Sequence, residues 1–138
     1  MGYYITLQDA NFTIPADKLD EATRRLKALN HKPGVYKRGG SYSGGKQAAS
    51  WFSWMSEKYD EELDSAKEIF EALGFDTETN EAGDLSLVYY DNKTGQEDLF
   101  LQEVSDLANE GWYLQFHGED GAIFRYTAQG ERKARIVW

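Results

Sequence analysis

The sequence predicts an α+β fold: an antiparallel sheet with a C-terminal three-stranded meander, and about four helices packed on one face. Two observations predict it. The expected helices are grouped in the middle of the chain rather than alternating with strands one by one. The last part of the chain alternates apolar and polar residues between tight turns, which is typical of antiparallel strands. With 138 residues, 41% of them hydrophobic, the chain is expected to form one domain over residues 1–138.

The first third of the chain predicts two extended pieces and a helix. Residues 3–8 are rich in aromatic and β-branched residues and predict a strand, and residues 12–14 predict a short second one. A helix is expected over residues 16–29, where Pro15 suits the first turn. The apolar positions of this helix recur at helical spacing: Leu19, Ala22, Leu26 and Leu29.

A glycine-rich segment follows this helix and predicts a mobile loop at about residues 34–46. It contains five glycines and two serines. Basic or titratable side chains are concentrated in and just before it, namely His31, Lys32, Lys37, Arg38 and Lys46.

Three further helices, one strand and the meander are expected in the rest of the chain. The helices are predicted over residues 47–59, 61–73 and 94–109, the strand over 85–90, and the meander strands over 112–117, 122–127 and 133–138. Gly74 suits the C-terminal end of the second of these helices. Thr94 and Glu97 form a capping box at the start of the third.

The charge of the chain is unevenly distributed. Residues 1–46 hold 8 Lys or Arg and 4 Asp or Glu, a net of +4, whereas residues 57–110 hold 3 and 17, a net of −14. The whole chain has a net charge of −9. Such a field shapes encounters with partners. It disfavours direct nucleic-acid binding, which the basic region at 24–46 could support only locally.

Composition also excludes several classes of function. Cysteine is absent, which excludes disulfides, thiolate catalysis and cysteine-based zinc sites. No apolar stretch is long enough to span a membrane, and no secretory signal is recognised at the N-terminus. We therefore expect a cytoplasmic protein with no cofactor and no metal.

An acidic row is the first candidate binding surface. Glu57, Glu61, Asp64, Glu68 and Glu71 recur three or four residues apart, so one helix could display them as a row. The first four are the predicted partner contacts. Such a row could imitate nucleic-acid phosphates and occupy a basic groove on a protein partner. The alternative is an ordinary solvated helix face.

A cluster of large aromatic residues at 51–54 is the second candidate. Trp51 and Trp54 flank Phe52, and the three cannot all face one side of a helix. One or two are expected in the core or covering the neighbouring loop. A remaining tryptophan could serve as an anchor for a partner.

Residues 40–46 match the GxxxxGK spacing of a phosphate-binding loop. Gln47 stands where a Ser or Thr should hold magnesium, which argues against nucleotide hydrolysis. Simple anion binding by Arg38, Gly40, Gly45 and Lys46 stays open, beside a plain solvated loop.

Two weaker patterns are more typical of turns. Alternating oxygen ligands at residues 76–84 resemble a calcium loop but lack its glycine and closing glutamate at the required positions. His117 precedes Glu119 and Asp120 in a hairpin and could act as an acid or base, and Arg125 could pair with either carboxylate.

Three motifs resemble a type of small protein common in bacteriophages and their bacterial hosts, to which no activity is attached. They are Trp51-Phe52-Ser53-Trp54, Leu73-Gly74-Phe75, and Gly118-Glu119-Asp120-Gly121 followed by Phe124-Arg125-Tyr126. The resemblance covers most of residues 50–137. It implies an accessory role, such as interference with a host or defence protein, and it implies no catalytic residue.

These observations favour a small, acidic, non-enzymatic binding protein that engages a protein partner through Trp51, Trp54 and the acidic row. The alternative is a protein that binds a small ligand or nucleotide through the basic glycine-rich loop. The identity of the partner and the oligomeric state stay open.

Overall fold

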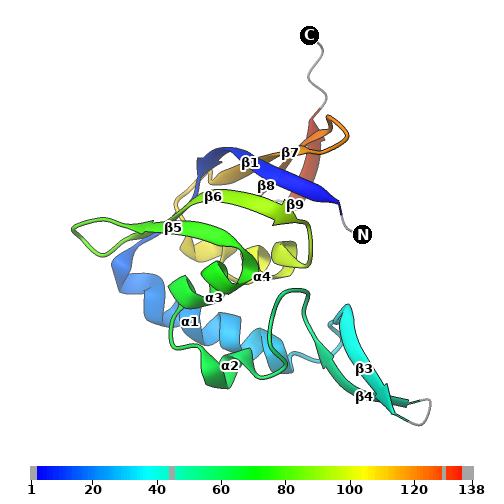
Figure 1. Ribbon diagram of the computed structural model, residues 1–138. Coiled ribbons are helices and arrows are strands. Elements are labelled where there is room, and N and C mark those ends of the chain that lie inside the picture. The colour runs from blue at the N-terminus through cyan, green and yellow to red at the C-terminus, as the bar shows by residue number, and fades with distance from the viewer. Residues whose placement is uncertain (1–2, 44–45, 129, 135–138) are drawn as a thin grey trace.

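The computed structural model describes residues 3–43, 46–128 and 130–134, and it confirms the α+β class. An antiparallel sheet forms one side of the molecule, and the helices lie together on one face of this sheet (Figure 1). The sheet runs in the order β6-β1-β7-β8-β9, and both β2 and β5 also pair with β6. Its strands are β1 (Tyr4–Asn11), β2 (Thr13–Ile14), β5 (Phe75–Thr79), β6 (Leu85–Lys93), β7 (Tyr113–Gly118), β8 (Ile123–Thr127) and β9 (Gly130–Ala134).

Among the described residues, four α-helices lie on one side of the sheet, which is the predicted number, although their positions differ from the predicted ones (Figure 1). They are α1 (Leu19–Ala28), α2 (Tyr59–Glu62), α3 (Ala66–Leu73) and α4 (Glu97–Glu103). Short 3-10 turns extend them: η1 (Ala16–Lys18), η2 (Leu29–His31) and η3 (Ser105–Leu107). Gly74 ends α3 with φ 117°, a left-handed conformation that glycine adopts without strain, so this predicted helix end is confirmed.

The core is aromatic and joins the helices to the sheet. Edge-on or tilted ring contacts run from Phe70 on α3 through Phe75 and Tyr90 to Phe116 on β7, with centroid separations of 6.0, 4.9 and 5.9 Å. Such arrangements add to the stabilisation that burial alone provides. This core fixes the helices, and through them it positions the segment before α2.

The expected loop at 34–46 and helix at 47–59 are largely wrong. Residues Gly39–Ser43 form β3 and Lys46–Trp51 form β4, and the two pair into a separate antiparallel sheet. We call these two strands, residues 39–43 and 46–51, the arm; they stand away from the main sheet in Figure 1. Gly39 lies opposite Trp51 in the register, and a Cβ on Gly39 would lie 2.1 Å from the indole nitrogen. Cross-strand packing of an indole over a glycine therefore overrides the local helical preference.

The predicted helices at 61–73 and 94–109 are each interrupted. Residues 63–65 separate α2 from α3, because the Ser65 hydroxyl accepts a hydrogen bond from the Glu68 N–H and begins a new helix. α4 ends at Glu103 and is followed by η3. The predicted capping box is not formed, because α4 begins after Gln96 and the Thr94 N–H donates to the Tyr3 carbonyl. The Glu97 carboxylate instead accepts hydrogen bonds from the Thr94 hydroxyl and the Gly95 N–H.

The C-terminal three-stranded meander is confirmed, although its last strand is β9 at 130–134 rather than 133–138; residues 135–138 lie outside the described residues. Its first turn holds the start of β1. Glu119 accepts a hydrogen bond from the Tyr4 N–H, and Asp120 accepts from the Tyr3 hydroxyl and the Ala122 N–H. Arg125 does not pair with either acid but donates to Gln115. The two carboxylates therefore have a structural role in joining the meander to the N-terminal strand.

Candidate functional site

A buried asparagine organises the foot of the arm, where the segment after α1 meets the segment before α2. Asn30 is 6% exposed. Its side-chain amide donates to the Glu57 carbonyl at 2.8 Å and to Asp60 Oδ1 at 2.7 Å. Because a buried amide must satisfy its hydrogen-bonding groups, these bonds fix η2 against the start of α2. Nothing in the sequence around Asn30 marks it as a junction.

Lys37 completes this junction without a carboxylate partner. Its Nζ donates to the Asn30 carbonyl oxygen and to Asn30 Oδ1, both at 2.8 Å. The same ammonium lies 5.2 Å from the centroid of the buried Phe52 ring. No ion pair of the described part of the chain involves it. Lys37 is therefore a half-buried cation held by neutral oxygens and an aromatic face.

His31 and Asp60 form the outer side of the junction. His31 Nε2 lies 2.6 Å from Asp60 Oδ2. Burial works to raise the pKa of Asp60, but hydrogen bonds from His31 and Asn30 outweigh it and hold that pKa below its usual value. Asp60 is therefore ionised at neutral pH and contributes a negative charge to this junction.

Two shallow cavities adjoin this junction. One, of about 330 Å³, is lined by Asn30, His31, Lys32, Val35, Tyr36, Lys37 and Ser50. The other, of about 400 Å³, is lined by Asn30, His31, Lys37, Ala49, Ser50, Glu57, Lys58, Asp60 and Glu61. Both volumes fall in the lower part of the range of small-molecule pockets. Only the second has carboxylates in its lining.

Gln96 fixes the arm to the body from the other side. Its Oε1 accepts hydrogen bonds from the N–H groups of Arg38 and Ser53, at 3.0 and 3.2 Å, and its Nε2 donates to the Tyr36 carbonyl at 2.8 Å. The side chain is 5% exposed. It thus bridges the chain entering the arm and the chain leaving it, a role that sequence reasoning missed.

The two tryptophans predicted as partner contacts have different environments. Trp51 ends β4 and covers Gly39, so it serves the arm itself. Trp54 is 46% exposed, and its indole N–H donates to the Lys93 carbonyl at 3.2 Å. Its backbone has φ 73°, a left-handed conformation that is unusual for a large residue. Phe52 between them is fully buried, which agrees with the expectation that part of the cluster is core.

The acidic row is not a single helical face. Glu57 precedes α2, Glu61 lies on α2, Asp64 lies in the break and Glu68 lies on α3. Glu57 and Glu61 meet at the larger cavity, whereas Asp64 and Glu68 flank the start of α3. The structure therefore brings together two of the four predicted acids.

The predicted anion-binding residues lie along the arm rather than at a helix start. Arg38 precedes β3, Gly40 lies in it, and Lys46 begins β4; Gly45 lies outside the described residues. Because a strand rather than a helix follows the GxxxxGK match, the arrangement that a phosphate-binding loop requires is absent there.

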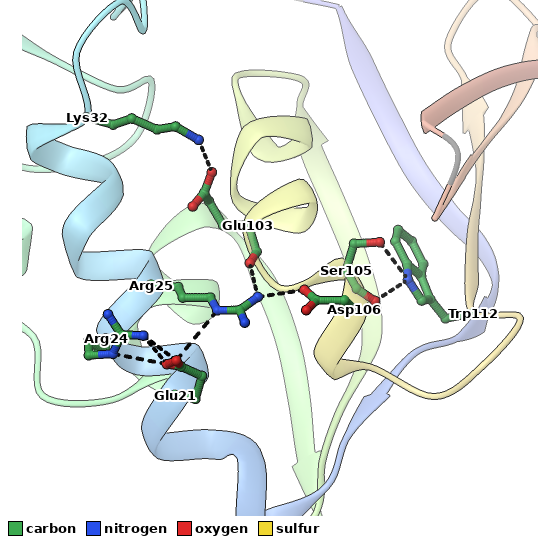
Figure 2. Close-up of polar contacts among 8 residues, drawn as sticks. All are labelled: Glu21, Arg24, Arg25, Lys32, Glu103, Ser105, Asp106 and Trp112. Carbon is green, nitrogen blue, oxygen red and sulfur yellow. Dashed lines mark hydrogen bonds and ion pairs between the residues drawn. The ribbon is translucent and has the colours of Figure 1, made fainter.

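Several cations of the basic region are already paired with acids of the body. Arg25 donates to Asp106 at 2.6 Å and to the Glu103 carbonyl at 3.3 Å, and Lys32 contacts Glu103 at 2.9 Å (Figure 2). Arg24 pairs with Glu21 in the same view (Figure 2). The contacts of Arg25 and Lys32 join α1 and the segment after it to α4 and η3, whereas the Arg24–Glu21 pair lies within α1. They leave Lys37 and Arg38, at the arm, outside the ion pairs of the described residues.

The chain was compared with known protein families, proteins and structures. No protein-family model, curated protein or solved structure matches the chain. Among the described residues, no group of three or more His, Asp or Glu side chains is arranged to hold a metal ion. The described helices include none with the length and apolarity needed to cross a bilayer.

Proposed function

We propose that this chain is a non-enzymatic binding protein that engages a protein partner through the arm and the residues at its foot. The observation that carries the proposal is the arm itself. It is a two-stranded sheet that pairs with no strand of the main sheet among the described residues. Two strands alone are marginally stable in water. A partner that adds a strand or covers the arm would stabilise it.

The composition of the arm supports strand addition. Between Arg38 and Lys46, and again from Gln47 to Trp51, the chain carries no charged residue. Exposed strand edges in proteins are usually protected by charged side chains or proline. Edges that lack this protection are ready to pair with an extended segment of another chain.

Trp54, Glu57 and Glu61 supply side-chain contacts beside the arm. An exposed tryptophan is a common energetic centre of an interface. The two acids favour a partner with a basic surface, and so the association should weaken with salt. The resemblance to phage accessory proteins is compatible with a host or defence protein as that partner. Mimicry of nucleic acid would have to use these two acids rather than the four-residue row.

Affinity capture from bacterial lysate, at about 0.05 and 0.5 M salt, tests the proposal. The wild-type chain is compared with Trp54→Ala and with the charge reversal Glu57→Lys/Glu61→Lys. A matched control, Glu78→Lys/Glu81→Lys, makes the same charge change at exposed acids of the β5–β6 hairpin.

The proposal predicts one dominant retained protein that is released by salt. The control should retain it, and both variants at the foot of the arm should lose most of it. Equal retention by all four proteins would place the contact elsewhere. The absence of any specifically retained protein would contradict the proposal.

A further inference from the structure

We infer that the cavity of about 330 Å³ at the foot of the arm binds a small aromatic phosphate ester of the nucleoside monophosphate class. This site is separate from the residues predicted for anion binding at 38–46, and it does not depend on a protein partner. The inference rests on the charged residues that line the cavity, on the hydrogen bonds that hold Lys37 and on the exposed ring of Tyr36.

The lining of this cavity contains two lysines, Lys32 and Lys37, and no carboxylate among the described residues, in a protein whose net charge is −9. Lys32 pairs with Glu103 and His31 contacts Asp60 outside the lining, whereas Lys37 has no such partner in the described part of the chain. The sequence shows the same bias, because no Asp or Glu occurs between Glu21 and Glu57. A concentration of positive charge around a concave surface favours an anionic ligand.

Lys37 provides a fixed cation that makes no ion pair among the described residues. Two of its three N–H groups donate to oxygens of Asn30, which sets the position of the ammonium. Because its two bonded oxygens are neutral, the ammonium can donate its third N–H to a phosphate oxygen, in a charge-assisted hydrogen bond. Lys32 can bind the same group while it remains close to Glu103, since an ammonium has three donors.

Tyr36 is the reason that we expect the ligand to contain an aromatic ring. Its side chain is 76% exposed although it lines the cavity, and its carbonyl is held by Gln96. An exposed aromatic ring beside lysine side chains is a combination with which proteins stack a base while binding its phosphate. Ser50, on the arm, adds a hydroxyl that can donate or accept a hydrogen bond.

Titration of the purified chain with adenosine monophosphate, inorganic phosphate and adenosine tests the inference, using calorimetry in a phosphate-free buffer. The variants are Lys37→Gln, Lys32→Gln and Tyr36→Ala. Lys67→Gln is the matched control, because Lys67 is an exposed lysine of α3 that pairs with Glu71 away from the cavity. Thermal unfolding of each variant shows whether it folds.

We expect saturable binding of adenosine monophosphate by the wild type and by Lys67→Gln, and about tenfold weaker binding by each of the other two lysine variants. Tyr36→Ala should weaken binding of adenosine monophosphate but not of inorganic phosphate. Adenosine alone should bind far more weakly than its phosphate ester.

Two results would overturn the inference. One is the absence of saturable binding of adenosine monophosphate by the wild type up to about 10 mM. The other is wild-type affinity in folded Lys37→Gln and Lys32→Gln. Because no partner protein is present, either result is independent of the capture experiment.

Discussion

At the scale of single residues, Gly39 shows how closely the arm depends on one missing side chain. The Trp51 indole occupies the space that a Cβ on Gly39 would need, with contacts of 2.1 to 2.8 Å to ring atoms. Contacts below 3 Å force either the ring or the backbone to move. The pair therefore sets the register of β3 against β4.

The change Gly39→Ala should destabilise the arm by about 1–3 kcal/mol, the usual cost of overpacking. Urea unfolding measures this as a lower midpoint if the arm unfolds with the body, and hydrogen exchange of residues 39–51 measures it directly. The double variant Gly39→Ala/Trp51→Ala removes the ring and should lose the steric part of the cost. A single variant with wild-type exchange in the arm would contradict the packing described here.

Glu97 makes a second prediction at this scale. It is 1% exposed, and burial raises its pKa, although hydrogen bonds from Thr94 and Gly95 act in the opposite direction. The folded state therefore binds a proton more tightly at this site than the unfolded state does. Its contribution to stability should fall as the pH rises from the ordinary glutamate value to the raised one.

The variant Glu97→Gln should flatten this part of the stability profile, which urea midpoints measured across that pH range would show. A dependence of stability on pH that is unchanged in Glu97→Gln would mean that Glu97 does not titrate as described.

Asp60 and Asp106 affect stability in a different, more acidic pH range. Their pKa values are lowered, so their stabilisation is present at neutral pH and is lost as the pH falls below the ordinary aspartate value.

At the scale of elements, the arm is connected to the body by side chains that belong to other elements. Gln96, just before α4, accepts hydrogen bonds from the segments that precede and follow the arm. Asn30 in η2 donates a hydrogen bond to the segment just before α2. The arm can therefore be loosened from the body without disturbing its own strand pairing.

The variant Gln96→Ala leaves three backbone groups without their side-chain partner, at a cost of about 1–3 kcal/mol for a buried group. We expect faster proteolytic cleavage at residues 36–38 and 52–54, with β6 and β7 remaining protected. Gln102→Ala, which changes an exposed glutamine of α4, is the matched control. Cleavage rates equal to those of the control would show that Gln96 does not hold the arm.

What the sequence could predict also differs between elements. The helix at 16–29 and the meander follow from local periodicity, and Gly74 marks a helix end by itself. The arm could not be found in this way, because its strands depend on the pairing of Trp51 with Gly39, twelve residues earlier. The break between α2 and α3 had a signal that was missed: Ser65 and Glu68 have the spacing of a capping box.

At the scale of the whole molecule, the two oppositely charged parts of the sequence are partly neutralised by folding. Arg25 and Lys32 face acids of α4 and η3, so the basic segment is not a uniformly positive surface (Figure 2). At the arm, Lys37 and Arg38 make no ion pair among the described residues, and Glu57 and Glu61 line one cavity together with Lys37. The sequence marks Lys37 only as one of several basic side chains and does not single out Asn30 or Asp60. The junction of these three residues could not be predicted, since each comes from a different segment.

Hydrogen exchange of the free chain, and of the chain bound to its captured partner, tests whether the arm is the contact surface. We expect amides of β3 or β4 to exchange readily in the free protein and to become protected in the complex, because a partner strand or surface covers them. A stable complex with unchanged exchange across residues 39–43 and 46–51, and protection only elsewhere, would contradict it.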